Sequence, residues 1–501
     1  MRRLTALLAV WFLAVPGSSF ALETDQYYTW GRPLADSTDV VNARFNLELE
    51  RAIAEIPQHR RRVTCREVSV AYRKRLRSML LHDIQVWAWN SKWVDRIPNG
   101  GEENRQYRRT NLYSRHSILA PASWMPNTPT IEVAGVRFGT DKLAHMVSSG
   151  WIYYTDYIKG LRNGFTPEEA KRRAVRHGFR EESQHLGMAT IGVLGVSDLE
   201  AGSAGMQFYN DLCDGESPVL RLDEDGWVIS RPIDLRNYVT PRWDESYQPQ
   251  VYSKGRWRKV RPVLETYCDR LDDPQVVEMR RRYREQDSDS LVGEMVAERV
   301  AEDKIPDPSQ FALEAVCDDP DPSRAVVADA TDRTEADSPG TDPAIARERV
   351  VGEDGDRRRF ALGLLGLKVS YPLLASASLA VMATSQVRSY DCTTPCDFRG
   401  FFGQIEPGLG GGKLSLGWAR VTGNTNRSKS LLRAGFIGAT YKLSVLRTWG
   451  EIGNVESGRT YAGFEIGVVL AQTNIGIGLL YRVDGGTDGR WMFIGGGGWG
   501  F

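Results

Sequence analysis

Three short segments hold most of the acidic, basic and imidazole side chains that lie in otherwise apolar, helix-forming sequence. They supply the candidate catalytic residues Asp141, Lys142, His145, Glu181, Glu182, His185 and Asp198. Carboxylates and imidazoles exchange protons with substrates and also ligate metal ions, whereas an ammonium group binds anions. These positions are therefore where we expect chemistry or specific binding.

One interpretation of this set is a metal-assisted hydrolase that uses a divalent cation. Glu182 and His185 are three residues apart, the spacing by which helix bundles present a carboxylate and an imidazole to one ion. We take His145, Glu182 and His185 as the candidate metal ligands. Asp141 and Asp198 would supply further ligands or a general base.

Two other interpretations need no metal. In one, Lys142 and His145 hold an anionic headgroup while Glu181 acts as a base or clamp. In the other, the same side chains form a buried polar network, in which Asp141 and Glu181 bind His or Arg partners and fix the packing of helices. The sequence thus indicates where a site lies more clearly than which reaction takes place there.

Capping signals place these residues on three helices. Thr140 precedes a helix that begins at Asp141, where a negative charge in the first turn interacts favourably with the helix dipole. The run Thr166-Pro167-Glu168-Glu169 is a capping box with proline at the first helical position. Ser197 and Glu200 repeat the capping-box pattern and indicate a third helix start. If these helices pack together, their polar residues form one cluster.

The three segments resemble the VanZ-like family and its relatives among envelope lipoproteins. The matching motifs are Asp141-Lys142-x-x-His145, Glu181-x-x-Gln184 and Ser197-Asp198-x-x-Ala201-x-x-x-Gly205. The resemblance covers about residues 138–210. It departs from the family at Gly202, where an asparagine is usual, and in helices too charged to span a membrane. The resemblance implies a role in the cell envelope rather than a particular reaction.

Residues 1–21 have the pattern of a secretory signal peptide. Arg2-Arg3 precedes an apolar run from Leu7 to Val15, and Ser19-Phe20-Ala21 matches a small-residue cleavage site. The apolar run is too short to span a bilayer. We therefore expect the mature chain to be exported.

Export makes disulfides the expected state of the cysteines. Cys392 and Cys396 are close enough in sequence to form a small loop-closing disulfide. Two more bridges, in any of three connectivities, are open to the remaining four. These four are Cys65, Cys213, Cys268 and Cys317.

Composition divides the rest of the chain into regions. With 64 basic and 64 acidic residues, the chain has no excess charge to offer nucleic acid. We expect a mainly helical domain over residues 22–317, within which 215–268 is irregular or β-rich. Residues 318–358 are rich in Asp, Pro and Ser, and predict an acidic disordered linker.

Residues 359–501 change to a period of two. Leu414 and Leu416 alternate with polar or small residues, and Phe464 lies between Gly463 and Glu465 in the same manner. About eight segments of this kind, with apolar residues outward and small or polar residues inward, predict a small transmembrane β-barrel. The terminal Phe501 resembles the last residue of bacterial outer-membrane proteins. A soluble β-sandwich, or a transmembrane helix over 360–384, are the alternatives.

The predicted fold class is thus an α+β multidomain protein, with a mainly α-helical periplasmic domain and an antiparallel transmembrane barrel of about eight strands. We expect an outer-membrane protein of a Gram-negative bacterium whose helical domain binds or processes an envelope lipid or glycan precursor. Its partners would be outer-membrane lipid, the barrel assembly machinery and that ligand, with no nucleic acid. A non-catalytic scaffolding protein and a metal-dependent hydrolase are the alternatives.

Overall fold

The structure, a computed structural model, describes most of the chain after the predicted signal peptide. The described residues are 23–500 except 57–62, 77–81, 115–127, 185–186, 225, 318–341, 356–357, 387–395, 425–434, 451–454, 472 and 486–490. They form two compact units, one helical over 23–352 and one barrel-containing from residue 353 onward. The predicted signal peptide lies outside the described residues.

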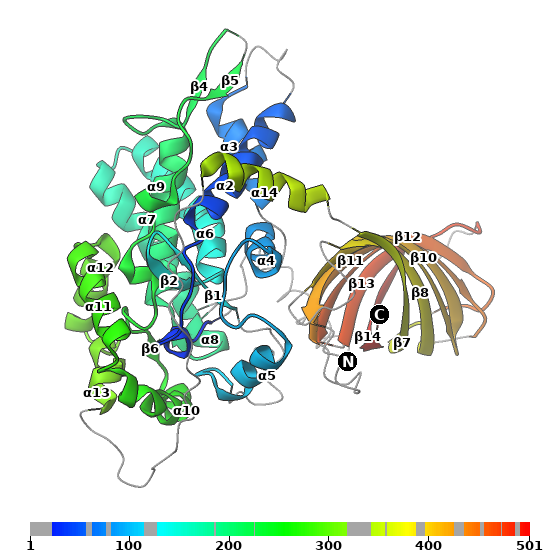
Figure 1. Cartoon of the computed structure of the whole chain (residues 1–501). Coiled ribbons are helices and arrows are strands. Elements are labelled where there is room, and N and C mark those ends of the chain that lie inside the picture. Colours follow the sequence, from blue (N-terminus) through cyan, green and yellow to red (C-terminus); the bar gives the residue numbers. More distant parts are fainter. Residues whose placement is uncertain are drawn as a thin grey trace. The chain divides into compact units, whose positions relative to one another are not determined.

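The helical unit is built around two long helices that lie side by side, α6 (Asp141–Arg162) and α9 (Val196–Cys213). Both helices appear in cyan to green in Figure 1. They approach closely because Gly150 faces Gly205: a Cβ atom on Gly150 would lie 2.5 Å from the Gly205 Cα. No side chain larger than hydrogen fits at this crossing.

Helix α7 (Pro167–Gln184) packs against α6 and begins as the sequence predicts. The Thr166 Oγ1 accepts the Glu169 N–H at 3.3 Å, and a Glu169 carboxylate oxygen accepts the Thr166 N–H at 2.9 Å. This reciprocal pair is a capping box. The capping box expected at Ser197 does not form, because α9 (Val196–Cys213) has Gly195 as its N-cap and Ser197 already lies in its first turn. The Ser197 hydroxyl accepts a hydrogen bond from the Gln250 side chain at 2.7 Å.

Further helices and short strands surround this pair. The remaining helices of the unit are α2 (Thr38–Ala54), α3 (Cys65–Leu76), α4 (Asp83–Asn90), α5 (Gly101–Thr110), α8 (Gly187–Thr190), α10 (Lys254–Leu264), α11 (Pro274–Gln286), α12 (Leu291–Ala301) and α13 (Leu313–Cys317). Its strands are β1 (Thr130–Val133), β2 (Val136–Gly139), β3 (Val193–Leu194), β4 (Leu220–Leu222), β5 (Trp227–Ile229) and β6 (Val251–Tyr252), paired as β1–β2, β3–β6 and β4–β5. The 215–268 region is thus mixed: two-residue and three-residue strands, 3-10 turns and α10.

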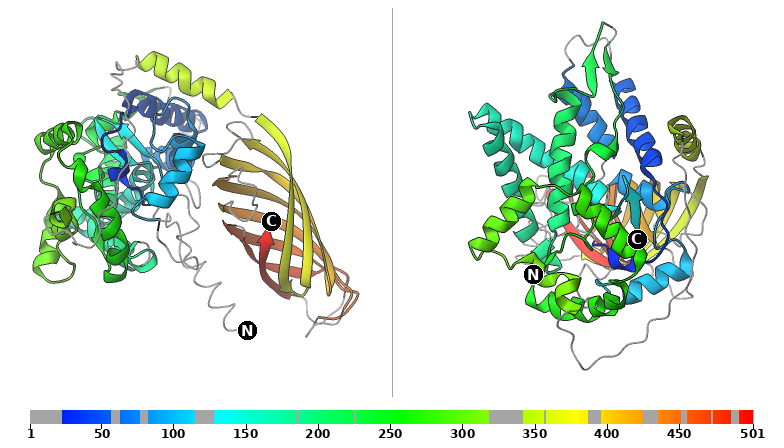
Figure 2. Two further views of the ribbon diagram at one scale, coloured as in Figure 1. Left: turned by 60° about the horizontal axis from the view of Figure 1, so that its bottom comes forward. Right: turned by 60° about the vertical axis from the view of Figure 1, so that its left-hand side comes forward.

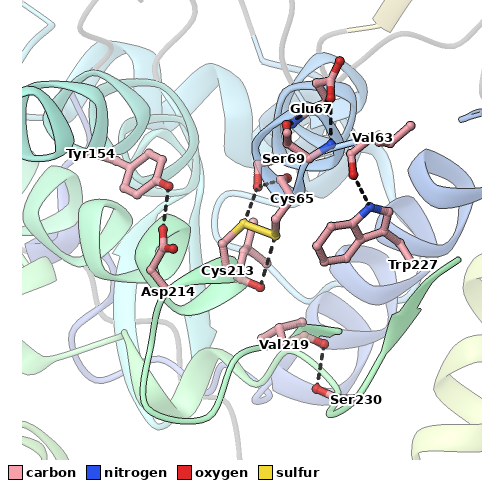
Figure 3. Close-up of a disulfide and its surroundings, with 12 residues drawn as sticks. Val63, Cys65, Glu67, Ser69, Tyr154, Cys213, Asp214, Val219, Trp227 and Ser230 are labelled. Carbon is pink, nitrogen blue, oxygen red and sulfur yellow. Dashed lines mark hydrogen bonds between the residues drawn. A yellow bond between two sulfur atoms is a disulfide. The ribbon is translucent and has the colours of Figure 1, made fainter. Parts of the chain in front are cut away.

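Two disulfides crosslink the helical unit. Cys65 on α3 bonds to Cys213 at the end of α9, as Figure 3 shows, and Cys268 bonds to Cys317. Next to the first bridge, the Trp227 Nε1 donates to the Val63 carbonyl at 3.0 Å, which ties the β4–β5 hairpin to the start of α3. The sequence left three connectivities open, and the structure selects this one. Cys392 lies outside the described residues.

The predicted disordered linker is partly wrong. Residues 318–341 lie outside the described part of the chain, but α14 (Pro343–Gly355) is a helix. Ala346 and Val350 are fully buried in the core of the helical unit, and Arg347 forms a 2.6 Å ion pair with Glu50. Ala346 and Val350 are four positions apart and form one apolar face, which favours a helix despite the acidic, proline-rich composition around it.

The C-terminal unit is a closed antiparallel barrel of eight strands, drawn in yellow to red in Figure 1, and Figure 2 shows its strands side by side. The strands are β7 (Arg358–Tyr371), β8 (Leu374–Gln386), β9 (Cys396–Gly408), β10 (Gly411–Asn424), β11 (Gly435–Thr448), β12 (Thr460–Ala471), β13 (Thr473–Arg482) and β14 (Trp491–Gly500). The ring closes where β14 pairs with β7. A β-sandwich and a helix over 360–384 are both excluded.

The predicted alternation of the barrel strands is confirmed. Leu416 and Phe493 are 68% and 76% exposed on the outside, whereas Lys413 and Glu465 are buried on the inside. The Lys413 ammonium lies 3.1 Å from the Glu465 carboxylate, and Glu406 lies 3.4 Å from the same ammonium. Inward charges of opposite sign thus pair within the barrel. Among the described helices, none has the length and apolar character needed to cross a bilayer.

The glycine contact between α6 and α9 predicts a strong effect of a single methyl group. Gly150→Ala places its Cβ against backbone that cannot rotate away, so we expect a loss of about 2 kcal/mol or more in the free energy of unfolding. Gly255→Ala is the control, because a Cβ there meets no atom within 4 Å. Urea unfolding followed by circular dichroism measures both. Equal stability of the two variants would contradict the close approach.

Candidate functional site

The centre of the candidate site is the ammonium group of Lys142, which is fully buried. Its Nζ donates to three carboxylates, Asp141 Oδ2, Asp198 Oδ1 and Glu245 Oε1, each at 2.6 Å. All three protons of the ammonium are therefore used. Lys142 is not presented to solvent, where an anionic headgroup would meet it.

Three elements bring these groups together. Asp141 and Lys142 occupy the first turn of α6, directly after β2, and Asp198 occupies the first turn of α9. Glu245 follows the 3-10 helix Pro241–Trp243. The close approach of α6 and α9 therefore positions the lysine between carboxylates that are far apart in the sequence.

Hydroxyl groups orient the carboxylates. The Asp141 Oδ1 accepts hydrogen bonds from the Thr24 and Thr128 hydroxyls at 3.0 and 2.8 Å. The Tyr113 hydroxyl donates to the Glu245 Oε2 at 3.2 Å. Asp141 and Glu245 thus each have one oxygen on Lys142 and another fixed by a neighbouring hydroxyl.

His145 lies one helical turn after Asp141 and is 2% exposed. Its Nε2 is 3.4 Å from the Asp198 Oδ1, and its Nδ1 is 3.4 Å from the Ser149 hydroxyl. One donor atom each from Asp141, His145 and Asp198 lie within 4.8 Å of one another. Within the described residues, this is the group whose composition and spacing suit a metal ion.

Two more carboxylates are buried beside this group. Glu23 is 6% exposed and neither of its oxygens has a hydrogen-bond partner among the described residues, while Glu182 is 4% exposed and its Oε2 has none. Burial raises the pKa of Glu23, and the charges of Glu245 and Asp198 raise it further. Burial likewise raises the pKa of Glu182, with Asp198 adding to the effect. The charges around Lys142 therefore affect the pKa values of both side chains.

The pKa values of the central groups follow from the same balance. Burial alone would lower the pKa of Lys142, but the carboxylates of Asp141, Asp198 and Glu245 outweigh it and raise that pKa. Burial would raise the pKa of Asp198, yet His145 and Lys142 hold it below its usual value. Burial raises the pKa of Glu245 to about 8. The lysine stays charged while one carboxyl group readily takes up a proton.

The cluster has more acidic than basic groups. Its five carboxyl groups face one ammonium and one imidazole, with the buried Arg256 guanidinium as a further positive charge near Glu23, and buried negative charge is unfavourable unless something neutralises it. Protons or a cation supply that charge, whereas an added anion would worsen the imbalance. The acidic members are Glu23, Asp141, Glu182, Asp198 and Glu245.

Five of the seven sequence-predicted site residues come together. Asp141, Lys142, His145, Glu182 and Asp198 lie in the cluster described above. Glu181 is partly exposed and lies 3.5 Å from the His177 imidazole, whose other nitrogen binds Asp156. His185 lies outside the described residues, so the ligand set His145, Glu182 and His185 stays a prediction. Among the described residues, the structure groups Asp141, His145 and Asp198.

Sequence reasoning missed Glu23 and Glu245. Neither belongs to the three motif segments, and each comes from a segment without regular helix or strand. The one available signal was local: Glu245 stands within Trp243-Asp244-Glu245-Ser246-Tyr247, where two acidic residues lie between aromatic residues that bury their neighbours.

Comparison of the chain with protein-family models, curated proteins and solved structures found no match.

The raised pKa of Glu245 predicts a pH dependence of stability. In the folded protein this carboxyl group titrates at about 8, above its ordinary value of 4.5. Its stabilising contribution is therefore complete below pH 4.5 and is lost as the pH rises through about 8. Between these limits, one proton changes the unfolding free energy by at most about 1.4 kcal/mol per pH unit.

The variant Glu245→Gln tests this dependence. We expect its unfolding free energy to fall less steeply with rising pH than that of the wild type, measured by urea unfolding in the presence of a chelator. Glu278→Gln is the control: Glu278 is exposed, and Arg281 lowers its pKa, so it titrates below this range. Parallel curves for wild type and Glu245→Gln would contradict the assignment.

Proposed function

We propose that the chain is an outer-membrane protein of a Gram-negative envelope, in which the barrel is an anchor and the helical unit works in the periplasm. On this proposal the helical unit binds or processes an envelope lipid or glycan. The observation that carries the proposal is the closed eight-stranded barrel with large apolar side chains outside and paired charges inside.

The outer surface of the barrel suits lipid. Side chains that alternate along single strands, such as Leu365, Leu367 and Val369 on β7, are each more than 60% exposed. In water such a surface would favour aggregation, whereas in a bilayer it is solvated. Strands of 10 to 14 residues match the length that a tilted strand needs to cross the hydrocarbon core.

The barrel interior favours an anchor over a pore. Barrels of eight strands have an interior just wide enough for side chains. Here Lys368, Lys413 and Lys442 pair with Glu406 and Glu465 across that interior at 3.1 to 3.7 Å. We therefore assign the ligand binding or processing to the helical unit and not to the barrel.

Two structural observations support a periplasmic location of the helical unit. An even number of antiparallel strands puts the start of β7 and the end of β14 at the same end of the barrel, so the chain enters and leaves on one side of the membrane. The helical unit carries two disulfides, which persist in oxidising compartments such as the periplasm. The signal-peptide pattern of residues 1–21 supports the same address.

Support for an envelope ligand comes from the motif resemblance to the VanZ-like family. The motif residues Asp141, Lys142, His145 and Asp198 are the ones that the fold gathers. A non-catalytic scaffolding role is the second candidate, favoured by the complete burial of Lys142, which also suits a network that fixes helix packing.

The membrane anchor is tested by charge on the outer barrel surface. Leu416→Arg places a guanidinium among lipid-facing side chains, which costs about 2–4 kcal/mol near the bilayer midplane. We expect less folded barrel, seen as loss of the fast-migrating band in unheated gel samples of the outer-membrane fraction. Leu222→Arg is the control, since Leu222 is 59% exposed on β4 of the helical unit. A wild-type protein found soluble in the periplasm would contradict the proposal.

A further inference from the structure

We propose that Asp141, His145 and Asp198 bind a divalent transition-metal ion, with Glu23 and Glu182 as the carboxylates available to complete its coordination. The inference goes beyond the proposed function and does not depend on the barrel. It differs from the ligand set that sequence spacing indicates, because the two aspartates come from the starts of α6 and α9.

The geometry of the donor atoms supports one shared ion. The three donors lie within 4.8 Å of one another. Imidazole and carboxylate ligands bind an ion such as zinc at about 2.0–2.2 Å, so neighbouring ligands of a tetrahedral ion lie about 3.5 Å apart and opposite ligands of any ion up to about 4.4 Å apart. Side-chain movements of up to about 1 Å, on the order of thermal displacement in three dimensions, close this set around an ion.

The orientation of His145 is the one that metal-binding histidines use. Its Nε2 faces Asp198, and its Nδ1 lies 3.4 Å from the Ser149 hydroxyl on the next turn of α6. When the hydroxyl accepts the Nδ1–H, the Nε2 lone pair is left for the metal, as in histidines that bind metals with an outer partner on the second ring nitrogen.

The second, independent observation is three buried carboxylate oxygens without a partner. Neither oxygen of Glu23 nor the Oε2 of Glu182 has a hydrogen-bond partner among the described residues, and both side chains are more than nine-tenths buried. A buried polar group without a partner is unfavourable, and more so if it is charged. A cation beside them removes this penalty.

Lys142 does not exclude the ion. A carboxylate oxygen has two lone pairs, so the Asp198 Oδ1 can accept from the ammonium and still face His145. One lysine and one divalent ion together bring three positive charges to five carboxylates. Lys142 is then the fixed counter-charge that holds Asp141 and Asp198 in place.

The donor set selects the class of ion. One imidazole with carboxylates suits zinc, manganese or iron, whereas calcium and magnesium favour oxygen ligands alone. No cysteine belongs to the group, and the four cysteines of the helical unit are committed to disulfides. Zinc and manganese(II) are therefore the probes of choice.

In the test, the full chain in detergent is first treated with a chelator. Zinc or manganese(II) is then titrated into it, and calorimetry measures the binding. We expect one class of tight site, whose affinity falls by about tenfold or more in His145→Gln. His177→Gln is the matched control: His177 also lies between two carboxylates, but on the surface, where it is 29% exposed. We expect that variant to bind as the wild type does.

Glu23→Gln keeps the test decisive if His145→Gln does not fold. Because the Glu23 oxygens have no partner in the described part of the chain, this change breaks no hydrogen bond there. We expect a folded variant with an unchanged or higher melting temperature in chelator, but weaker metal binding. Absence of a tight site in the wild type, binding lost in His177→Gln instead, or binding equal in wild type, Glu23→Gln and a folded His145→Gln would overturn the proposal.

Discussion

The helical unit depends on one buried ammonium. Lys142 sits among Asp141, Asp198 and Glu245, and its removal would leave three carboxylates facing one another in a medium that solvates charge poorly. This requirement links the starts of α6 and α9 to a loop about a hundred residues from the lysine. The glycine contact between the two helices gives the ion pairs their geometry, because a wider crossing would separate the partners.

As the membrane anchor that we propose, the barrel obeys a different constraint. In a membrane every backbone N–H and C=O must be paired within the protein, so a sheet must close on itself. Pairing of β14 with β7 achieves this closure with strands whose exposed side chains are apolar. The two units therefore solve opposite problems: the barrel turns apolar groups outward, and the helical unit encloses charge. Each uses internal ion pairs to neutralise what it buries.

These contrasts explain what the sequence predicts well. Period-two alternation is local, so residues such as Leu416 and Glu465 reveal their side of the sheet without knowledge of the rest of the fold. The capping box at Thr166 is equally local. Glu23 and Glu245 are not predictable in this way, since their importance arises only when distant segments meet. The helix α14 was missed because its two buried apolar residues stand within acidic sequence.

We expect that, in the protein as it exists in the cell, a metal ion neutralises the buried excess of carboxylates. Elemental analysis of the chain extracted from the outer-membrane fraction, purified without added metal or chelator, measures this most directly. We expect a first-row transition metal in near-equal molar ratio to protein, reduced in His145→Gln and retained in His177→Gln. A folded wild-type protein that contains no such metal would contradict the account and leave protons as the neutralising charge.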